Sequence, residues 1–217
     1  TLCSNKRPKI LILKLFGTKI VYDVHEDVPK QLFHSAKMPQ AICVVIGRVY
    51  LGFEWVAMRT FDACVVVVPA MQERFSRDDT ILLANFPSLA EFPAIPETTR
   101  ERVPGRFVYV GGIVAVRGVN EMVEAIGQVA DDRARLHLLG AFGDKELQAR
   151  VHGLDGWQRV NFLGWSSRDT VVAELSQASA GLVLLHPTPQ YVISYPVKMF
   201  EYMAAGLPVI ASDFPLW

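Results

Sequence analysis

The sequence predicts an α/β protein of two lobes, each a parallel β-sheet with helices packed against it. Short apolar runs rich in β-branched residues alternate with longer helical patterns, which is the pattern of stacked βαβ units. A proline-rich stretch without sustained periodicity interrupts this alternation, which then restarts with glycine after most of the apolar runs. We expect the first lobe to begin part-way through its fold and the second to end early.

The first lobe is expected to occupy residues 1–85. Strands are predicted at residues 19–24, 63–68 and 81–84, with a short helix at 70–75. The run of valines in the second strand predicts burial on both faces of the sheet. A long helical region containing Pro29 and Pro39 lies between the first two strands.

A semi-rigid linker is expected over residues 86–104, where prolines stand at 87, 93, 96 and 104. The second lobe, residues 105–217, has predicted strands at 106–110, 134–139, 160–163 and 181–185 and another from 208. Its predicted helices cover 118–130, 144–151, 167–176 and 196–205.

Composition excludes some function classes. The 22 basic residues are balanced by 22 acidic ones, so the basic excess of a nucleic-acid-binding protein is missing. Cys3, Cys43 and Cys64 are odd in number and scattered, which indicates reduced thiols in the cytoplasm.

The most apolar stretch, residues 41–61, contains Arg48, Glu54 and Arg59, and we expect these charges to exclude an ordinary transmembrane span. We predict a buried core helix, while the apolar part at 41–55 is also compatible with peripheral membrane contact.

The segment from Ser194 to Gly206 has the features of a helix that begins at a ligand site. Ser194 can cap the helix, Pro196 suits its first turn, and Gly206 ends it. Amide N–H groups at a helix start attract anions, and Lys198 lies beside them. Glu201 is on the same helical face. The spacing equally fits an amphipathic helix in which Lys198 and Glu201 form an ion pair.

The string PVKMFEYMAAGLPVIASD in this segment resembles the donor-binding motif of retaining family 4 glycosyltransferases, in the branch written SxPxKxFEYMAxGxPVI. The resemblance implies the GT-B fold, in which two Rossmann-like domains face each other across a cleft. Glu201 matches the glutamate that holds the donor ribose, whereas the earlier glutamate of the family pattern falls at Ile193. Ser194 and the residues Val197 and Met199 at the helix start are the implied neighbours of the donor.

FVYVGGIVAVRGVNEMVEAI, from Phe107, resembles the opening strand, turn and helix of the family's second domain. Gly111 and Gly112 would let the backbone approach a diphosphate, although such a turn alone is usually structural. Arg117 stands in the place of the family's phosphate-binding lysine, and Gly112 replaces its arginine.

Two further segments of the second lobe point to the donor. VNFLGWSSRDTVVAEL resembles the family segment that borders the nucleobase, here Gly164, Trp165 and Ser166, although Trp165 also fits plain packing. His186 follows a predicted strand at its carboxyl end, where open α/β sheets bind ligands.

In the first lobe, IVYDVHEDVPKQL resembles the branch motif YDVHEDxPKQ, which makes His25 the active-site histidine that contacts the donor sugar. Glu26 and Asp27 would cap the next helix or act as a base on the acceptor hydroxyl.

The implied activity is a hexosyltransferase that moves a sugar from a UDP- or GDP-sugar to a glycan or lipid-linked acceptor with retention, in surface polysaccharide biosynthesis. The expected location is the cytoplasm, at the inner membrane face. Arg117, Lys198 and the amides near Val197 would neutralise the departing diphosphate without a metal or cofactor, and no DxD motif is present.

Three other functions stay open. A nucleotide-sugar epimerase has a similar fold, and product analysis would separate it from a transferase. A nicotinamide oxidoreductase shares the alternating pattern but has the GxGxxG fingerprint that this chain does not contain. The third is a non-catalytic module that binds nucleotide without turnover.

Overall fold

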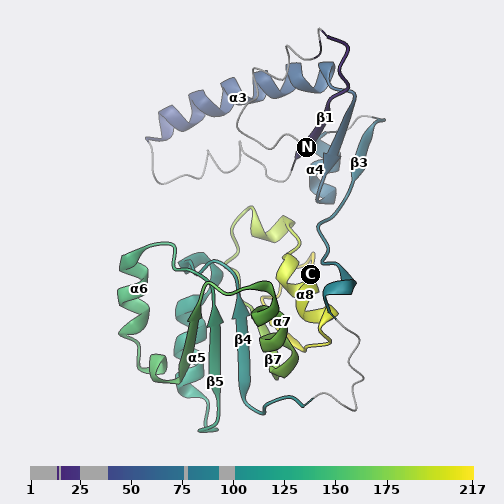
Figure 1. Cartoon of the computed structure of the whole chain (residues 1–217). Coiled ribbons are helices and arrows are strands. Elements are labelled where there is room, and N and C mark those ends of the chain that lie inside the picture. The colour runs from purple at the N-terminus through teal and green to yellow at the C-terminus, as the bar shows by residue number, and fades with distance from the viewer. Residues whose placement is uncertain (1–13, 15, 25–38, 76–77, 93–100) are drawn as a thin grey trace. The chain divides into compact units, whose positions relative to one another are not determined.

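The computed structural model describes residues 14, 16–24, 39–75, 78–92 and 101–217. The chain divides into two compact units (Figure 1). The first comprises Thr1–Asn85 with Val192–Tyr195, and the second comprises Phe86–Tyr191 with Pro196–Trp217. Both contain a parallel sheet covered by helices, so the predicted α/β class is confirmed.

The first unit is built on a three-stranded parallel sheet of order β1-β2-β3. The strands are β1 (Val21–Val24), β2 (Ala63–Val66) and β3 (Thr80–Leu82), and α4 (Pro69–Arg74) follows β2. Cys64 and Val66 are fully buried, but Ala63 and Val65 between them are only half-buried. The prediction that this strand is buried on both faces is therefore wrong, because one face of it stays partly accessible.

The long helix α3 (Gln40–Thr60) lies between β1 and β2 and is more exposed than predicted. Its buried residues are Cys43, Gly47, Glu54 and Ala57, whereas apolar side chains such as Val45 and Val49 are exposed. The expectation of a buried core helix is thus wrong for this part of the chain. By length and composition alone α3 could also cross a membrane, since its charges are few enough, and only 22% of it is buried. Arg48, Glu54 and Arg59 therefore do not exclude a span, and helix length and composition are weak evidence for one.

The second unit is built on a five-stranded parallel sheet of order β6-β5-β4-β7-β8. The strands are β4 (Arg106–Val110), β5 (Arg135–Leu139), β6 (Val160–Gly164), β7 (Ala180–Val183) and β8 (Val209–Ala211). The chain leaves β4 toward β5 and β6, then returns to β7 and β8 on the other side of β4. The strand order therefore reverses between β4 and β7, which is where open α/β sheets bind ligands at the carboxyl ends of their strands.

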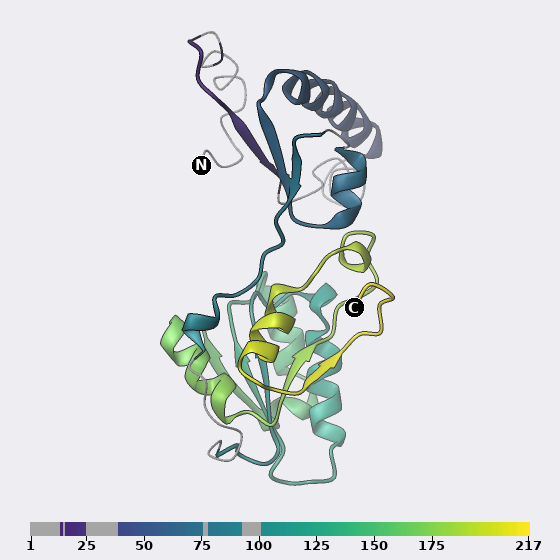
Figure 2. The same ribbon diagram turned by 90° about the vertical axis from the view of Figure 1, so that its right-hand side faces the viewer.

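Helices cover both faces of this second sheet (Figure 2). On one face, α5 (Val119–Gln128) and α6 (Lys145–His152) pack on Leu136 and Leu138 of β5 in the main core. His137, between these leucines, points to the opposite face and contacts Glu174 of α7 (Arg168–Gln177). The helix α8 (Val197–Ala204) connects β7 to β8 in the same sense, so right-handed crossovers place it with α7.

Capping side chains explain where two of these helices begin. The Asp144 carboxylate accepts a hydrogen bond from the amide of Leu147, and the Ser167 hydroxyl accepts one from Thr170. The predicted cap of the last helix is wrong, however. The residue at the N-cap of α8 is Pro196, which makes no side-chain cap, and Ser194 lies two residues earlier in the segment grouped with the first unit.

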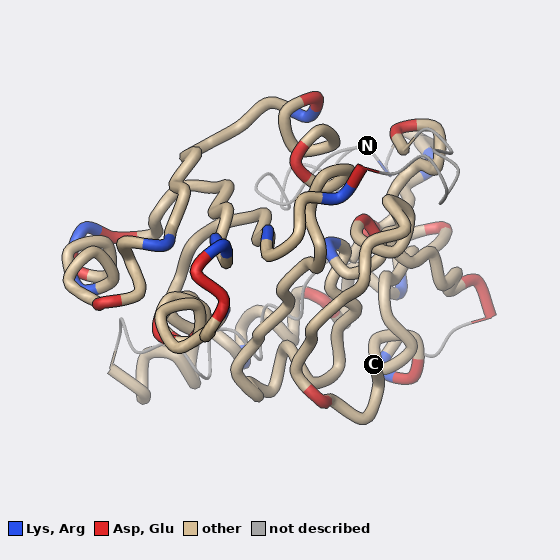
Figure 3. Tube along the Cα trace, turned by 90° about the horizontal axis from the view of Figure 1, so that it is seen from below, with Lys and Arg blue, Asp and Glu red and all other residues tan. Residues whose placement is uncertain are grey.

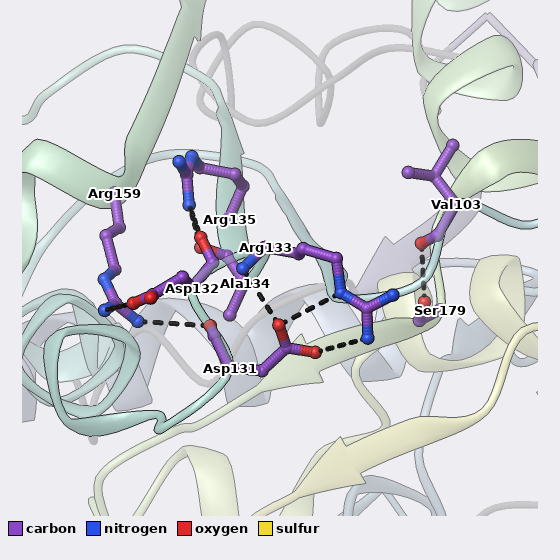
Figure 4. A network of polar contacts seen from close by, with 8 residues as sticks. All are labelled: Val103, Asp131, Asp132, Arg133, Ala134, Arg135, Arg159 and Ser179. Atoms are coloured by element: carbon purple, nitrogen blue, oxygen red, sulfur yellow. Dashed lines mark hydrogen bonds and ion pairs between the residues drawn. The ribbon is translucent and has the colours of Figure 1, made fainter.

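A polar network fastens the turn between α5 and β5 at the end of the sheet away from the strands' carboxyl ends (Figure 4). Arg159 donates to the carbonyl of Val129 and to the carboxylate of Asp132, and Arg133 forms an exposed pair with Asp131. Basic and acidic residues are interspersed along the described trace (Figure 3).

Candidate functional site

The loop that follows β4 brings two glycines against two cationic side chains. Gly111 has φ +131°, a conformation open to glycine. A Cβ added there would lie 3.0 Å from Nζ of Lys198 and 3.7 Å from Nη1 of Arg117. A Cβ at Gly112 would lie 3.3 Å from the same Nη1. Side chains at these positions would therefore occupy the space in front of both cations.

Lys198 enters this cluster from the first turn of α8. Its ammonium lies over the ring of Tyr109, 3.9 Å from the centroid, and is largely buried. Among the described residues its Nζ has no hydrogen-bond partner. Burial, and then the charge of Arg117, lower the pKa of Lys198 to about 7, while the nearby carboxylate of Glu201 acts in the opposite direction. A buried cation without a partner is costly for the fold and is available to an anion.

Arg117 ends the 3₁₀ turn Ala115–Arg117 and is held by neutral groups. Its Nε donates to the hydroxyl of Tyr191 (3.3 Å) and its Nη1 to the carbonyl of Gly112 (3.3 Å). The hydroxyl of Tyr109 donates to the same carbonyl (2.8 Å), and burial raises the pKa of Tyr109 to about 12. The two cations therefore converge at a place where their immediate partners carry no negative charge.

The loop after β7 is fixed to the loop after β4 by direct contact. Gly118 has φ +71°, and a Cβ there would come within 2.3 Å of the carbonyl oxygen of Leu184. The amide of His186 donates to the carbonyl of Val116 (2.9 Å). The ring Nε2 of His186 lies 2.8 Å from the carboxylate of Glu121 in the first turn of α5. His186 is therefore beside the candidate site, with one ring nitrogen already engaged.

Glu201 does not pair with Lys198, although the two lie three residues apart on α8. Its Oε1 accepts a hydrogen bond from Nη1 of Arg168 (2.7 Å), the first residue of α7. Arg168 also donates through Nε to Glu91 (2.6 Å). The ion pair that spacing alone allowed is thus replaced by one with a residue from another helix.

The loop after β6 carries the residues expected beside the nucleobase. Gly164 ends the strand with φ +67°, and the hydroxyl of Ser166 donates to its carbonyl (3.2 Å). Trp165 is 82% exposed, so it does not serve as plain packing within the described part of the chain. An exposed indole face is available for stacking.

The remaining predicted site residues either lie outside the described part of the chain or make only backbone contacts at the start of α8. His25, Glu26 and Asp27 lie outside the described residues. Val197 is the first residue of α8, and the amide of Met199 donates to the carbonyl of Pro196 (2.9 Å). The described residues contain no group of three or more His, Cys, Asp or Glu side chains that could hold a metal ion. Metal independence stays a prediction.

The arrangement as a whole suits an anion at the carboxyl ends of β4 and β7, beside the first turn of α8. The ammonium of Lys198 and the guanidinium of Arg117 lie beside the backbone of Gly111 and Gly112 and near the start of α8. None of the described acidic residues pairs with Lys198. Phosphate groups are the anions that such a combination binds most often in α/β proteins.

Comparison with known proteins identifies the family of the chain. Residues 104–216, just over half of the chain and most of the second unit, match the model of the family described as glycosyl transferases group 1. The chain belongs to this family. The search of curated proteins found no match to the chain.

Solved glycosyltransferases show the same fold at low sequence identity. Sucrose-phosphate synthase from Thermosynechococcus elongatus matches with a TM-score of 0.67 and 21% identity over 94% of this chain and 52% of its own. HepE of Anabaena, solved with UDP and glucose, matches with 0.65 and 17% over 94% and 56%. A glycosyltransferase involved in avilamycin A biosynthesis matches with 0.53 and 16% over 69% and 44%. The fold is therefore GT-B, and the chain spans about half the length of these proteins.

Several residues of the site were not predicted from the sequence. Tyr109 and Tyr191 contact the two cations, Glu121 contacts His186, and Arg168 contacts Glu201. Tyr109 is the penultimate residue of β4, just before the glycine turn, and this position is a usable signal. Arg168 and Glu201 are 33 positions apart in the sequence, so no local sequence pattern indicates their contact.

Proposed function

We propose that the second unit binds the nucleoside diphosphate of a sugar donor, and that the protein is a retaining hexosyltransferase of family 4. Its acceptor would be a glycan or a lipid-linked glycan made at the cytoplasmic face of the membrane for a surface polysaccharide. Membership of the glycosyl transferases group 1 family and the fold shared with HepE, which was solved with UDP and glucose, support the proposal.

The buried ammonium of Lys198 is the observation that carries the proposal. It has no hydrogen-bond partner among the described residues and lies beside Arg117 at the point where the strand order reverses. Two neighbouring cations repel each other, and an anion between them would remove that repulsion. A diphosphate supplies the charge and the acceptor oxygens, and the glycines leave room for it.

The same geometry suits the chemistry of transfer. When the sugar leaves, negative charge grows on the diphosphate, and fixed cations stabilise that charge without further reorganisation. In this scheme Lys198 and Arg117 hold the diphosphate, Glu201 accepts hydrogen bonds from the ribose, and Trp165 stacks on the base. These roles need no metal ion.

Calorimetry on the full chain with UDP, GDP and ADP, in the presence of EDTA, tests the proposal. We expect one of the three to bind, and Arg117→Ala to weaken it by about 10- to 100-fold, because a charged hydrogen-bond donor to phosphate is lost. Arg150→Ala, which removes an exposed arginine of α6, is the matched control and should leave binding unchanged. Failure of all three nucleotides to bind, or equal effects of the two substitutions, would contradict the proposal.

A further inference from the structure

Arg168 forms a bridge between the candidate ribose-binding carboxylate and a segment that precedes the second sheet. Its guanidinium donates to Glu201 through Nη1 (2.7 Å) and to Glu91 through Nε (2.6 Å). It also lies over the ring of Phe92, 5.1 Å from the centroid, and Phe92 itself is buried. Glu91 ends the 3₁₀ turn Leu89–Glu91, within the stretch expected to be a linker.

The position of Arg168 is electrostatically unfavourable without these partners. It is the first residue of α7, where the helix dipole presents positive charge and disfavours a cation. Two carboxylates compensate for this, and their hydrogen bonds raise the pKa of Arg168 although its partial burial acts the other way. The guanidinium is fixed on three sides, by Glu91, by Glu201 and by the ring of Phe92.

This arrangement determines how Glu201 is presented. Arg168 binds Oε1 and leaves Oε2 of the same carboxylate as an acceptor, because a carboxylate has more acceptor sites than one arginine nitrogen uses. The Glu201 side chain is only 17% exposed, so a fixed rotamer decides where Oε2 points. Lys198, one turn earlier on the helix, cannot do this, since its ammonium lies over Tyr109.

We propose that Arg168, itself anchored by Glu91, is a positioning residue that fixes the Glu201 carboxylate for the ribose hydroxyls and so sets the preference for ribonucleotides over 2′-deoxyribonucleotides. This inference rests on the proposed function, because it assigns the nucleotide to the second unit. It adds a residue from α7 and one from the preceding segment to the recognition of the sugar of the nucleotide.

The test compares the affinity of the full chain for UDP and 2′-deoxy-UDP by calorimetry, or for the GDP or ADP pair if one of these binds more tightly. In the wild-type chain we expect the ribonucleotide to bind about tenfold more tightly, the effect of one hydrogen bond to a charged acceptor. Arg168→Ala should reduce this ratio to about twofold or less while the affinity for the 2′-deoxynucleotide changes little.

Three variants complete the design. Glu91→Gln should lower the ratio less than Arg168→Ala, because Arg168 keeps its bond to Glu201. Arg168→Lys should retain part of the ratio, because an ammonium can still bind one carboxylate. Arg133→Ala removes an arginine from an exposed ion pair with Asp131 in the same unit, and should keep the wild-type ratio.

The outcomes separate this inference from the proposed function. If the wild-type chain binds no nucleoside diphosphate, both are wrong. If it binds but Arg168→Ala keeps the wild-type ratio, or weakens both nucleotides equally, only the positioning role is wrong. A tighter ribonucleotide complex in Arg168→Ala would show that Arg168 competes with the ribose, which also overturns the inference.

Discussion

At the scale of single residues, burial of the Lys198 ammonium has opposite consequences for stability and for binding. An unfolded lysine has a pKa near 10.5, whereas Lys198 in the folded chain has a pKa of about 7. Between these values the unfolded chain binds more protons, so folding becomes more favourable as pH rises through this window. Below pH 7 both states are protonated and the full cost of the buried charge is present.

Lys198→Met should therefore stabilise the chain and abolish nucleotide binding. Methionine keeps the length and packing of the side chain but removes the charge, so we expect a gain on the order of 2 kcal/mol at pH 6. The gain should shrink as pH rises from about 7 toward 9.5, since wild-type Lys198 then becomes neutral. Urea unfolding at several pH values, with calorimetry for binding, measures both effects.

Lys145→Met is the control for the Lys198 substitution, because Lys145 is exposed at the start of α6. It should change neither binding nor the pH dependence of unfolding. A Lys198→Met chain that is less stable than the wild type at pH 6 would show that the ammonium has a partner in solution and would contradict the anion-site interpretation.

The sequence predicted individual site residues unequally well. Gly111, Gly112, Arg117 and Lys198 were predicted as neighbours and lie together, because two of them follow one strand and the others stand at helix starts at the same edge of the sheet. Their role in binding stays a prediction. Glu201 was correctly placed on α8, but its partner Arg168 comes from another helix and could not be inferred from spacing.

At the scale of secondary-structure elements, local signals located the helices of the second unit to within about two residues. Asp144 and Ser167 cap α6 and α7 as their positions before helical patterns indicate, and glycine follows several strands. The exposure of α3 was missed, because an apolar helical pattern has the same sequence whether or not other segments cover it. Burial is a property of tertiary packing and is not encoded in the local period.

The contact between the loops after β4 and β7 gives a prediction at this scale. Gly118→Ala should destabilise the second unit by about 3 kcal/mol or more, because the left-handed backbone and a clash with the Leu184 carbonyl add together. Gly164→Ala shares the positive φ (+67°) but would meet nothing within 4 Å, so its cost should be about 1 kcal/mol. Urea unfolding compares the two.

Gly164→Ala thus measures backbone strain alone, and the difference between the two variants measures the contact between the loops. Equal destabilisation by both substitutions would mean that the two loops separate easily. The contact between them would then not fix the relative positions of the candidate diphosphate-binding residues.

At the scale of the whole molecule, the described residues of the candidate site are unevenly distributed between the two units. The family match at residues 104–216 lies within the second unit apart from the short segment 192–195, and the described cationic residues of the candidate site lie there too. The first unit contributes a small parallel sheet and the exposed helix α3. Its predicted contribution, His25, lies outside the described residues, so the acceptor side of the reaction rests on the sequence alone.

This division predicts where a nucleotide protects the full chain from hydrogen exchange. With saturating UDP, or whichever diphosphate binds, protection should rise in peptides that contain the β4–α5 loop at 111–118 and the start of α8 at 196–201. These segments contain Arg117, Lys198 and Glu201, and ordering them around an anion reduces local opening. A smaller effect is expected at 164–168, where Trp165 and Arg168 border the base and ribose.

Peptides from the first unit provide the internal control of the same experiment. Peptides covering β2 and α4, residues 63–74, should exchange at the same rate with and without nucleotide. The described residues that we expect to bind the diphosphate lie in the other unit. The Lys198→Met variant should show no nucleotide-dependent protection in any peptide. This result would separate specific binding from a general effect of the salt added with the nucleotide. Protection confined to the first unit would contradict the assignment of the donor to the second.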